Sequence, residues 1–551
     1  MASLEGEREI MSETINEYTS LLSNNETSNS PILKEPWYKT PSPYWAVFFS
    51  SINALSFGLI MTTKVEFYVQ SVCKQYYNSK ETPSIIFNDK CNIPEIQAIT
   101  SQLMMVLSLC LAVPGIFLLV PLGALSDRRG RRIILLMSCA GKILDVLCII
   151  LVGNYMESLG IGFLIIGTLV DGFMGSFPSM LAATHAYATD CTPPERRRVT
   201  FGLMHAGLLL SVGIGPVLGG MLTEYTNDLL STFYVSITTS IILFFLILFI
   251  IPESLSKKRQ LDNHKRQLEN DQHIFKKILN IFTPLSIFLS DDLHNNERVQ
   301  TTEDNDKIPA INARKYSLLS TAGISLMFSI AIFSVSSILL LYVRYKFEWS
   351  LVEQGYLYTV ICITRVFILM FLFPLVVKMF KERQRRKDDR IVQTQREDDN
   401  NVEDDILVQD EKQMNKELTF DLWVIRIGIF LEIVAFVLFG MATDGATFFT
   451  GIYTGAAGII ATPTLKSLQT NLVPPSQTGQ LLGALSVLES ISNTIGPLIV
   501  NTLYSILVIE KIPYLIWYGV SITYAIAFLF SFGIRAAKNK NKNVEMGDVV
   551  S

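Results

Sequence analysis

Residues 123–132 read Gly-Ala-Leu-Ser-Asp-Arg-Arg-Gly-Arg-Arg, and this charged stretch separates two long apolar runs at 99–125 and 133–153. A helix that spans a membrane needs about 20 predominantly apolar residues, and each run is long enough. Hydrocarbon offers no hydrogen-bond partner to a free backbone group, so such runs are expected to be helical. The charged stretch is therefore predicted to be a short loop between two spanning helices.

The apolar pattern repeats along the chain. Its 551 residues are 49% hydrophobic and 17% charged, whereas a typical soluble protein has about 25% charged residues. We predict an all-α membrane protein with twelve transmembrane helices in two six-helix halves. The predicted spans are 45–67, 99–125, 133–153, 158–187, 201–223 and 231–252, then 317–343, 352–377, 420–441, 447–468, 480–505 and 514–534.

Basic residues set the expected orientation. Lys and Arg crowd the connections at 126–132, 195–198, 253–316 and 378–419 and the C-terminal tail. Cytoplasmic loops carry an excess of these residues, so both termini are predicted to be cytosolic. The expected organisation is a disordered cytosolic tail (1–43), a first half (44–252), a cytosolic central loop (253–316), a second half (317–534) with a cytosolic insertion (378–419), and a cytosolic tail (535–551).

Several function classes are disfavoured. The chain has no basic stripe for nucleic acid, and it lacks the G-x-x-x-x-G-K-[S/T] loop that would cradle ATP phosphates. It also lacks H-E-x-x-H and G-x-S-x-G, so we expect no enzyme, metal or cofactor. Cys73 and Cys91 share one hydrophilic loop; they would form a disulfide if that loop faces an oxidising lumen, and would otherwise stay thiols.

The 123–132 stretch resembles the signature loop of the major facilitator superfamily, G-x-L-x-D-R-x-G-R-R. The resemblance implies a transporter whose two halves rock against each other. We expect Gly123 to let two helices approach closely. We expect Asp127 to cap the following helix and to pair with the arginines behind it, and Gly130 to permit the tight turn. The residues expected to form this gating loop are Gly123, Asp127, Arg128, Gly130, Arg131 and Arg132.

Further motifs narrow the resemblance. The stretch Gly213-Ile-Gly-Pro216-Val-Leu-Gly-Gly220 looks like an element of proton-coupled drug antiporters, and Pro252-Glu-Ser254 is a common close to the first half. Residues around Asp190 and the glycines of the fifth span are similar to tetracycline/proton antiporters. Residues 170–173, 186–196 and 202–206 together are similar, more closely, to the proton-coupled folate transporter family. That family implies a functional aspartate at Asp171 and a proton-coupling acid where this chain has His205. The connection between the fourth and fifth spans supplies Asp190, Arg196 and Arg197 as further site residues.

Ionisable groups at bilayer depth are costly, so each is a candidate site. Asp171, Arg365 and Glu489 lie deep on helices expected to face the centre; either acid would carry a proton, and Arg365 would hold an anionic substrate or a counter-carboxylate. An Arg365–Glu489 structural pair is the alternative. Lys64 and Glu66 are expected either to snorkel or to function. Lys142 and Asp145, three residues apart, are expected to neutralise each other. Three other groups are expected to be structural or hydrated: Arg426, Glu432 and His185.

These features favour a secondary active transporter, proton-coupled, that moves a small organic solute across a lipid bilayer by alternating access; Arg365 and Lys64 would suit an organic anion. The alternative is a non-transporting nutrient sensor with the same fold. The sequence Glu17-Tyr-Thr-Ser-Leu21-Leu22 matches the acidic dileucine pattern that sorting adaptors bind. We therefore favour a vacuolar or lysosomal membrane over the plasma membrane, and we expect a monomer.

Overall fold

A computed structural model of the chain describes residues 40–77, 89–193, 196–257, 259–262, 285–289, 308–380, 382–383, 402–473 and 478–534. The described residues from Ser42 onward belong to one compact unit. The possible sorting motif at Glu17, Leu21 and Leu22 lies outside the described residues, as do most of the central loop and of the 378–419 insertion.

The first half is a sequence of helices. Its elements are α2 (Pro43–Tyr77), η1 (Asp89–Cys91), α3 (Pro94–Arg129), α4 (Arg131–Asn154), α5 (Met156–Leu159), α6 (Phe163–Phe173), α7 (Ser176–Asp190), α8 (Arg197–Thr226) and α9 (Ser231–Phe249).

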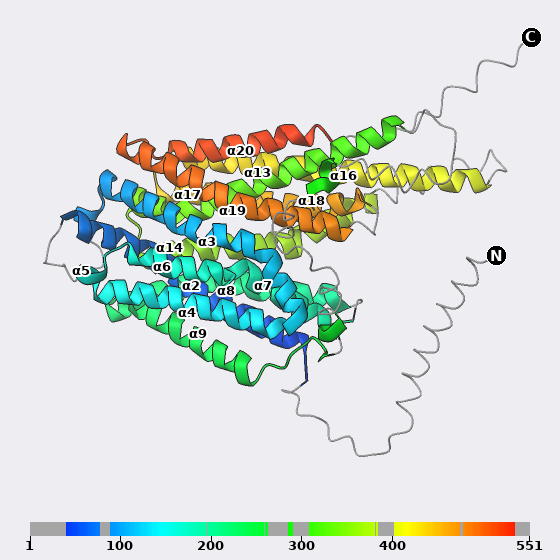
Figure 1. The fold of residues 1–551 in the computed structure, drawn as a ribbon. Helices are drawn as coiled ribbons and strands as arrows, with labels where there is room; N and C mark the ends of the chain where they lie inside the picture. Colours follow the sequence, from blue (N-terminus) through cyan, green and yellow to red (C-terminus); the bar gives the residue numbers. More distant parts are fainter. Residues whose placement is uncertain are drawn as a thin grey trace, which may run out of the picture. The chain divides into compact units, whose positions relative to one another are not determined.

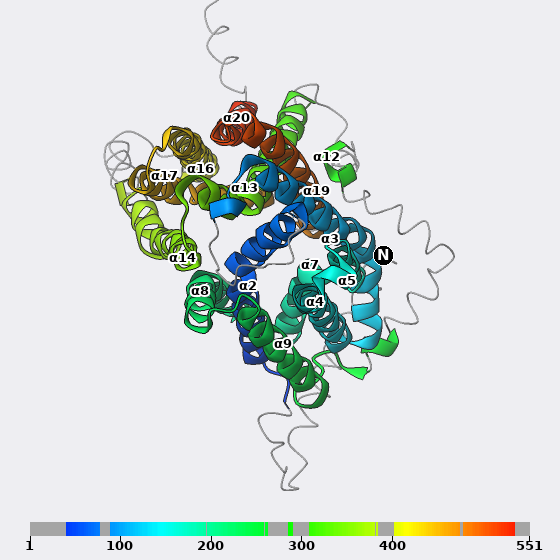
Figure 2. The same ribbon diagram turned by 90° about the vertical axis from the view of Figure 1, so that its left-hand side faces the viewer.

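The second half is also helical. Its elements are α13 (Ile308–Phe347), α14 (Leu351–Phe367) with a π-helical turn η6 (Ile368–Leu372), α16 (Val402–Met441), α17 (Gly445–Gly458), α18 (Ala461–Asn471), α19 (Thr478–Ile509) and α20 (Leu515–Ser531), after the short α12 (Ser286–Leu289). In the described part of the chain, ten helices are long and apolar enough to cross a membrane. The α17–α18 pair and α20 complete the predicted twelve spans. Figures 1 and 2 show these helices side by side in two groups, with α2, α4 and α9 in one and α13, α16 and α20 in the other.

Two spans differ from the continuous helices that the sequence predicted. The span at 158–187 is broken between α6 and α7, where Gly175 takes a left-handed φ of +93° that glycine adopts without a steric penalty. The span at 447–468 is broken between α17 and α18 at Ile459 and Ile460. Each half therefore has a broken fourth helix.

Helices also extend into stretches expected as loops. Helix α2 continues to Tyr77, which places Lys64 and Glu66 well inside it. Helix α13 begins at Ile308 and α16 begins at Val402. The tails and loops assigned from the sequence otherwise stay predictions.

The glycine-rich part of α8 allows close packing on both halves. A Cβ on Gly219 would overlap the carbonyl oxygen of Leu59 on α2, and one on Gly220 would lie 2.9 Å from the carbonyl carbon of Leu351 on α14. Small residues of this kind let membrane helices bring their backbones together. Helix α8 thus joins α2 in its own half to α14 in the other.

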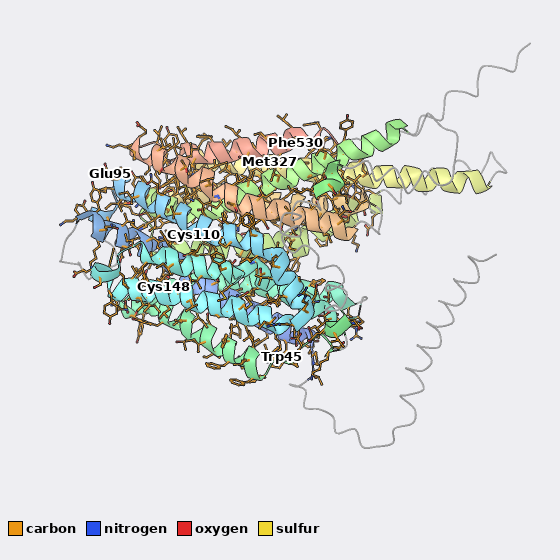
Figure 3. All side chains as sticks on the ribbon, viewed as in Figure 1. Trp45, Glu95, Cys110, Cys148, Met327 and Phe530 are labelled. Atoms are coloured by element: carbon orange, nitrogen blue, oxygen red, sulfur yellow. A yellow bond between two sulfur atoms is a disulfide. The ribbon has the colours of Figure 1, made fainter. Side chains whose placement is uncertain are left out.

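The two ends of the bundle differ. We call the end with residues 126–132 the arginine-loop end, and the end where Cys73 and Cys91 form a disulfide, with Cα atoms 5.5 Å apart, the disulfide end. Figure 3 shows Trp45, at the start of α2, and Glu95, at the start of α3, at opposite ends. Contacts between the halves gather toward the disulfide end: Asn92 donates to the Tyr345 carbonyl at 3.4 Å, Ser101 to the Asn501 carbonyl at 2.9 Å, and Thr359 to the Gly213 carbonyl at 2.6 Å.

The expected close helix approach at Gly123, near the arginine-loop end, is not found. A Cβ built on Gly123 or on Gly202 would meet no described atom within 4 Å. Among the described residues, the contacts between the halves gather toward the disulfide end, and the helices leave open space around Gly123 and Gly202 at the arginine-loop end.

Candidate functional site

Asp145 on α4 connects three helices of the first half. Its Oδ2 accepts from the Lys64 ammonium of α2 at 3.0 Å, and its Oδ1 accepts from the Thr168 hydroxyl of α6 at 3.1 Å. Lys64 therefore does not snorkel to the membrane surface. It is held inside the first half by a carboxylate.

Lys142 does not pair with Asp145, so the predicted neutralisation within α4 is wrong. Its ammonium instead donates to the carbonyl and the side-chain oxygen of Asn53, each at 3.3 Å, and to the Ser56 hydroxyl at 3.0 Å. Helix α2 presents these oxygens to α4, while it presents Lys64 to Asp145. Two lysines thus bind different acceptors along the same helix pair.

Asp171 completes this group of charges. Its Oδ1 is buried and makes no hydrogen bond among the described residues. It fits a notch at Gly141, where an added Cβ would lie 2.8 Å from that oxygen. Lys64, Lys142 and Asp145 all act on it electrostatically. We call Lys64, Lys142, Asp145 and Asp171 the first-half charge cluster.

Glu66 is also internal, so of its two predicted alternatives snorkelling is wrong. Its carboxylate binds the Arg344 guanidinium of α13 through two donors: Nε contacts Oε2, and Nη2 donates to Oε1 at 3.0 Å. The side chains are only 1% and 4% exposed. This pair joins the two halves near the disulfide end. The sequence prediction missed Arg344 because the seventh span was ended at residue 343.

The alternative pairing of Arg365 with Glu489 is wrong. Glu489 on α19 accepts from Lys466 on α18 at 3.3 Å, and both side chains are exposed. Arg365 on α14 instead acts electrostatically on Glu432 of α16. The Arg365 Nε is buried and has no hydrogen-bond partner among the described residues.

His205 on α8 lies apart from the contacts of the first-half charge cluster described above. It is exposed, and it interacts electrostatically with His185 on α7 and with Lys466 on α18. His185 also packs edge-on against Phe201, with ring centroids 5.4 Å apart. These three bases come from both halves, and two of them were absent from the site predicted from sequence.

The arginine loop has the expected pairing with Asp127 but a different helix cap. Arg131 binds Asp127 at 2.5 Å and Asp190 of α7 at 3.1 Å. The first backbone N–H groups of α4, at Arg131 and Arg132, donate to the Glu253 carboxylate at 2.8 and 3.1 Å. Glu253 rather than Asp127 caps α4, and an acid there complements the positive end of the helix.

The other arginines of this region differ from one another in contacts and exposure. Arg132 donates to the Ile247 and Leu248 carbonyls at the end of α9, at 2.8 and 2.7 Å. Gly130 takes a φ of +100°, as its turn requires. Arg128 is half-buried on α3, Arg196 is exposed, and the side chain of Arg197 lies outside the described residues.

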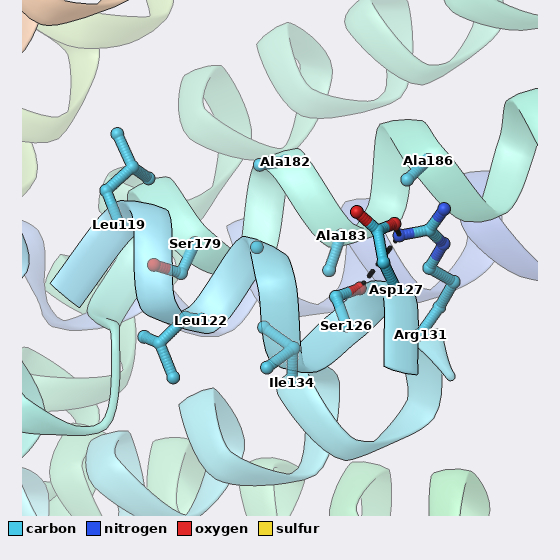
Figure 4. A pocket seen from close by; sticks show the side chains of 11 residues that line it. Leu119, Leu122, Ser126, Asp127, Arg131, Ile134, Ser179, Ala182, Ala183 and Ala186 are labelled. Carbon is cyan, nitrogen blue, oxygen red and sulfur yellow. Dashed lines mark hydrogen bonds and ion pairs between the residues drawn. The ribbon is translucent and has the colours of Figure 1, made fainter. Parts of the chain in front are cut away.

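A cavity of about 180 Å³ lies beside the arginine loop (Figure 4). Asp127 and Arg131 border one side, and Ala182, Ala183 and Ala186 of α7 border another. Small side chains on α7 and Gly123 on α3 leave this space. The remaining lining residues are Leu119, Leu122, Ser126, Ile134 and Ser179.

Comparisons with known proteins agree with this architecture. The family model described as Major Facilitator Superfamily matches residues 43–386. The chain is 22% identical over 475 residues to the MFS-type transporter avaJ of Aspergillus versicolor, covering 85% of this chain and 84% of that one. The human organic anion transporter MFSD10 (TETRAN) has a similar fold, with a TM-score of 0.51, 14% identity, and coverage of 90% of this chain and 100% of that one.

Two local matches agree with the resemblances seen in the sequence. The proton-coupled folate transporter of Bos taurus is 28% identical over 131 residues, covering 24% of this chain and 28% of that one. The class B tetracycline resistance protein of Escherichia coli is 30% identical over 141 residues, covering 26% and 32%. From the family match and the twelve-helix architecture, the chain belongs to the Major Facilitator Superfamily and is a membrane transporter.

Proposed function

We propose that this protein is a proton-coupled transporter of a small organic anion, and that Asp171 carries the coupling proton. The observation that carries the proposal is the buried, unpartnered Oδ1 of Asp171 inside a group of charges. A buried polar atom without a partner is costly. Burying the charged form costs more still, and a proton on Asp171 would remove that charge.

The charge balance of the first-half cluster supports the coupling. With both acids ionised and both lysines charged, the cluster is neutral. When Asp171 takes a proton, one positive charge is left over, and the site attracts an anion. Solute binding would in turn favour protonation, because coupling between two ligands is reciprocal.

Two further basic residues have a place in this proposal. Arg365 has a buried Nε that lacks a partner among the described residues, and a guanidinium matches a carboxylate well. His205 is exposed and lies where the resembled folate-transporter family has a proton-coupling acid. We assign Arg365 to the solute and His205 to a secondary protonation.

The setting follows from the charge distribution. We place both termini and the arginine-loop end in the cytosol, and the disulfide end in the lumen of a vacuole or lysosome, where a disulfide is stable. In this arrangement we assign the structure to a cytosol-open state. The Asp127–Arg131–Asp190 network would rearrange when the halves close on that side.

Flux in reconstituted vesicles tests the proposal. Purified protein is assayed with and without an imposed pH gradient, against a panel of organic anions, drugs and metabolites. We expect gradient-driven flux that Asp171→Asn abolishes while solute exchange without a gradient persists. Asp228→Asn changes an exposed acid at the disulfide end and serves as the matched control. Equal flux with and without the gradient would refute proton coupling, and unchanged coupling in Asp171→Asn would remove that residue.

A further inference from the structure

The third helices of the two halves share a spacing. In α4, Gly141 precedes Asp145 by four residues, and in α16, Gly428 precedes Glu432 by four. Residues four apart lie on one face of a helix. Each of these two helices packs against the broken fourth helix of its own half.

The glycine of each pair touches the break itself. A Cβ on Gly141 would lie 2.8 Å from the Met174 side chain, between α6 and α7. A Cβ on Gly428 would lie 2.7 Å from the Ala461 side chain, where α18 begins. In both halves, therefore, the same face of the third helix packs against the break in the fourth helix.

The acid of each pair is buried against a glycine of the fourth helix. A Cβ on Gly167 of α6 would lie 3.2 Å from the Asp145 Cα. On α17, a Cβ on Gly455 would lie 3.4 Å from the Glu432 Oε2, and one on Gly458 would lie 2.7 Å from its Cγ. Glu432 is 5% exposed. Its carboxylate thus lies directly beside the break in the second half.

Each acid has a base from another helix. Asp145 binds Lys64, and Arg365 acts electrostatically on Glu432. Around Glu432, α14 contributes Arg365, α20 contributes Tyr524, and α17 contributes the two glycines. Arg365 lies just before the π-helical turn Ile368–Leu372, a local irregularity that is frequent at functional sites.

We propose that Glu432 is a second proton-binding carboxylate, so that the second half has a protonation site beside its broken helix, as Asp171 on α6 provides one in the first half. This inference rests on the proposed proton coupling. A proton from water on the acidic side binds the Glu432 carboxylate, and Arg365 loses its counter-charge. Arg365 then binds the solute anion, and release of the proton on the other side restores the negative charge of Glu432 and expels the solute.

The test measures protons moved per solute in vesicles, together with infrared difference spectra of the purified protein between acidic and alkaline pH. Glu432→Gln should lower the proton-to-solute ratio by one proton and should remove a protonated-carboxyl band. Glu432→Asp should keep both. Glu224→Gln alters an exposed acid of α8 and should match wild type in both measurements.

The outcomes separate this inference from the proposed function. Gradient-independent flux in wild type would overturn both together. Coupled flux in wild type with an unchanged ratio and an unchanged carboxyl band in Glu432→Gln would overturn the inference alone. If Glu432→Gln yields little folded protein, Glu432→Gln/Arg365→Gln leaves no unpaired charge at this site. Carboxyl bands in that double variant that are identical to those of wild type, with none lost beside the band of Asp171, would likewise overturn the inference.

Discussion

Two ion pairs, one toward each end of the bundle, show how differently the ends are built. Glu66 and Arg344 are 1% and 4% exposed, bind through two donors, and join α2 to α13 across the halves. Glu489 and Lys466 are 47% and 58% exposed, make a single contact at 3.3 Å, and join two helices of one half.

The two pairs differ in whether water can take the place of a lost partner. A buried charge that loses its partner has no substitute, so the Glu66–Arg344 pair holds the disulfide end closed as long as it stays intact. An exposed pair exchanges its partner for water at little cost. Lys466 is therefore available to an incoming anion, whereas Arg344 is not until the halves separate.

Breaking the buried pair should have the largest effect. Glu66→Gln leaves Arg344 buried without a counter-charge, and we expect a loss of about 3–5 kcal/mol in the free energy of unfolding. Thermal unfolding in detergent measures this loss. Glu66→Gln/Arg344→Met removes both charges and should recover most of the stability. A Glu66→Gln variant as stable as wild type would mean that the pair does not hold this end.

Alanine substitutions of two glycines on α8 should have opposite effects on stability, depending on which end of the bundle the glycine is near. Gly219→Ala places a methyl group against the Leu59 backbone, and overpacking of this kind costs about 1–3 kcal/mol. Gly202→Ala on the same helix meets open space near the arginine-loop end, and alanine is favoured over glycine in a helix by up to about 1 kcal/mol.

Both variants are compared by unfolding temperature. We expect Gly219→Ala to unfold at a lower temperature than wild type, and Gly202→Ala to unfold at the same temperature as wild type or at a higher one. Equal destabilisation by the two substitutions would contradict the difference in packing between the ends.

The sequence was sufficient to predict the spans and the arginine loop, but not the pairing of the charged residues. Hydropathy locates spans because every spanning residue contributes to it, so the twelve helices and the 123–132 motif were recognised. It cannot show which helices are neighbours. The partners of the charged residues were therefore predicted wrongly: Asp145 binds Lys64 rather than Lys142, and Glu489 binds Lys466 rather than Arg365.

Local irregularities were also beyond a pattern of apolar residues. The break at Gly175 lies inside a continuous apolar run, and only its left-handed φ shows that the helix ends there. Glu253 caps α4 from a residue more than one hundred positions later in the chain. The Pro252-Glu-Ser254 motif was noticed, but its partner was set by the packing of α9 against α4.

The smallest effect on stability is expected at the exposed pair. Glu489→Gln should change the free energy of unfolding by about 0–1 kcal/mol, because water screens both partners. Transport should respond more than stability does: Lys466, released from Glu489, should bind an anionic solute more tightly, so we expect a lower KM for anions and an unchanged KM for neutral solutes. Thermal unfolding and concentration-dependent flux measure the two quantities. A stability loss as large as that of Glu66→Gln would show that the arginine-loop end is closed around this pair, and the contrast between the two ends would then fail.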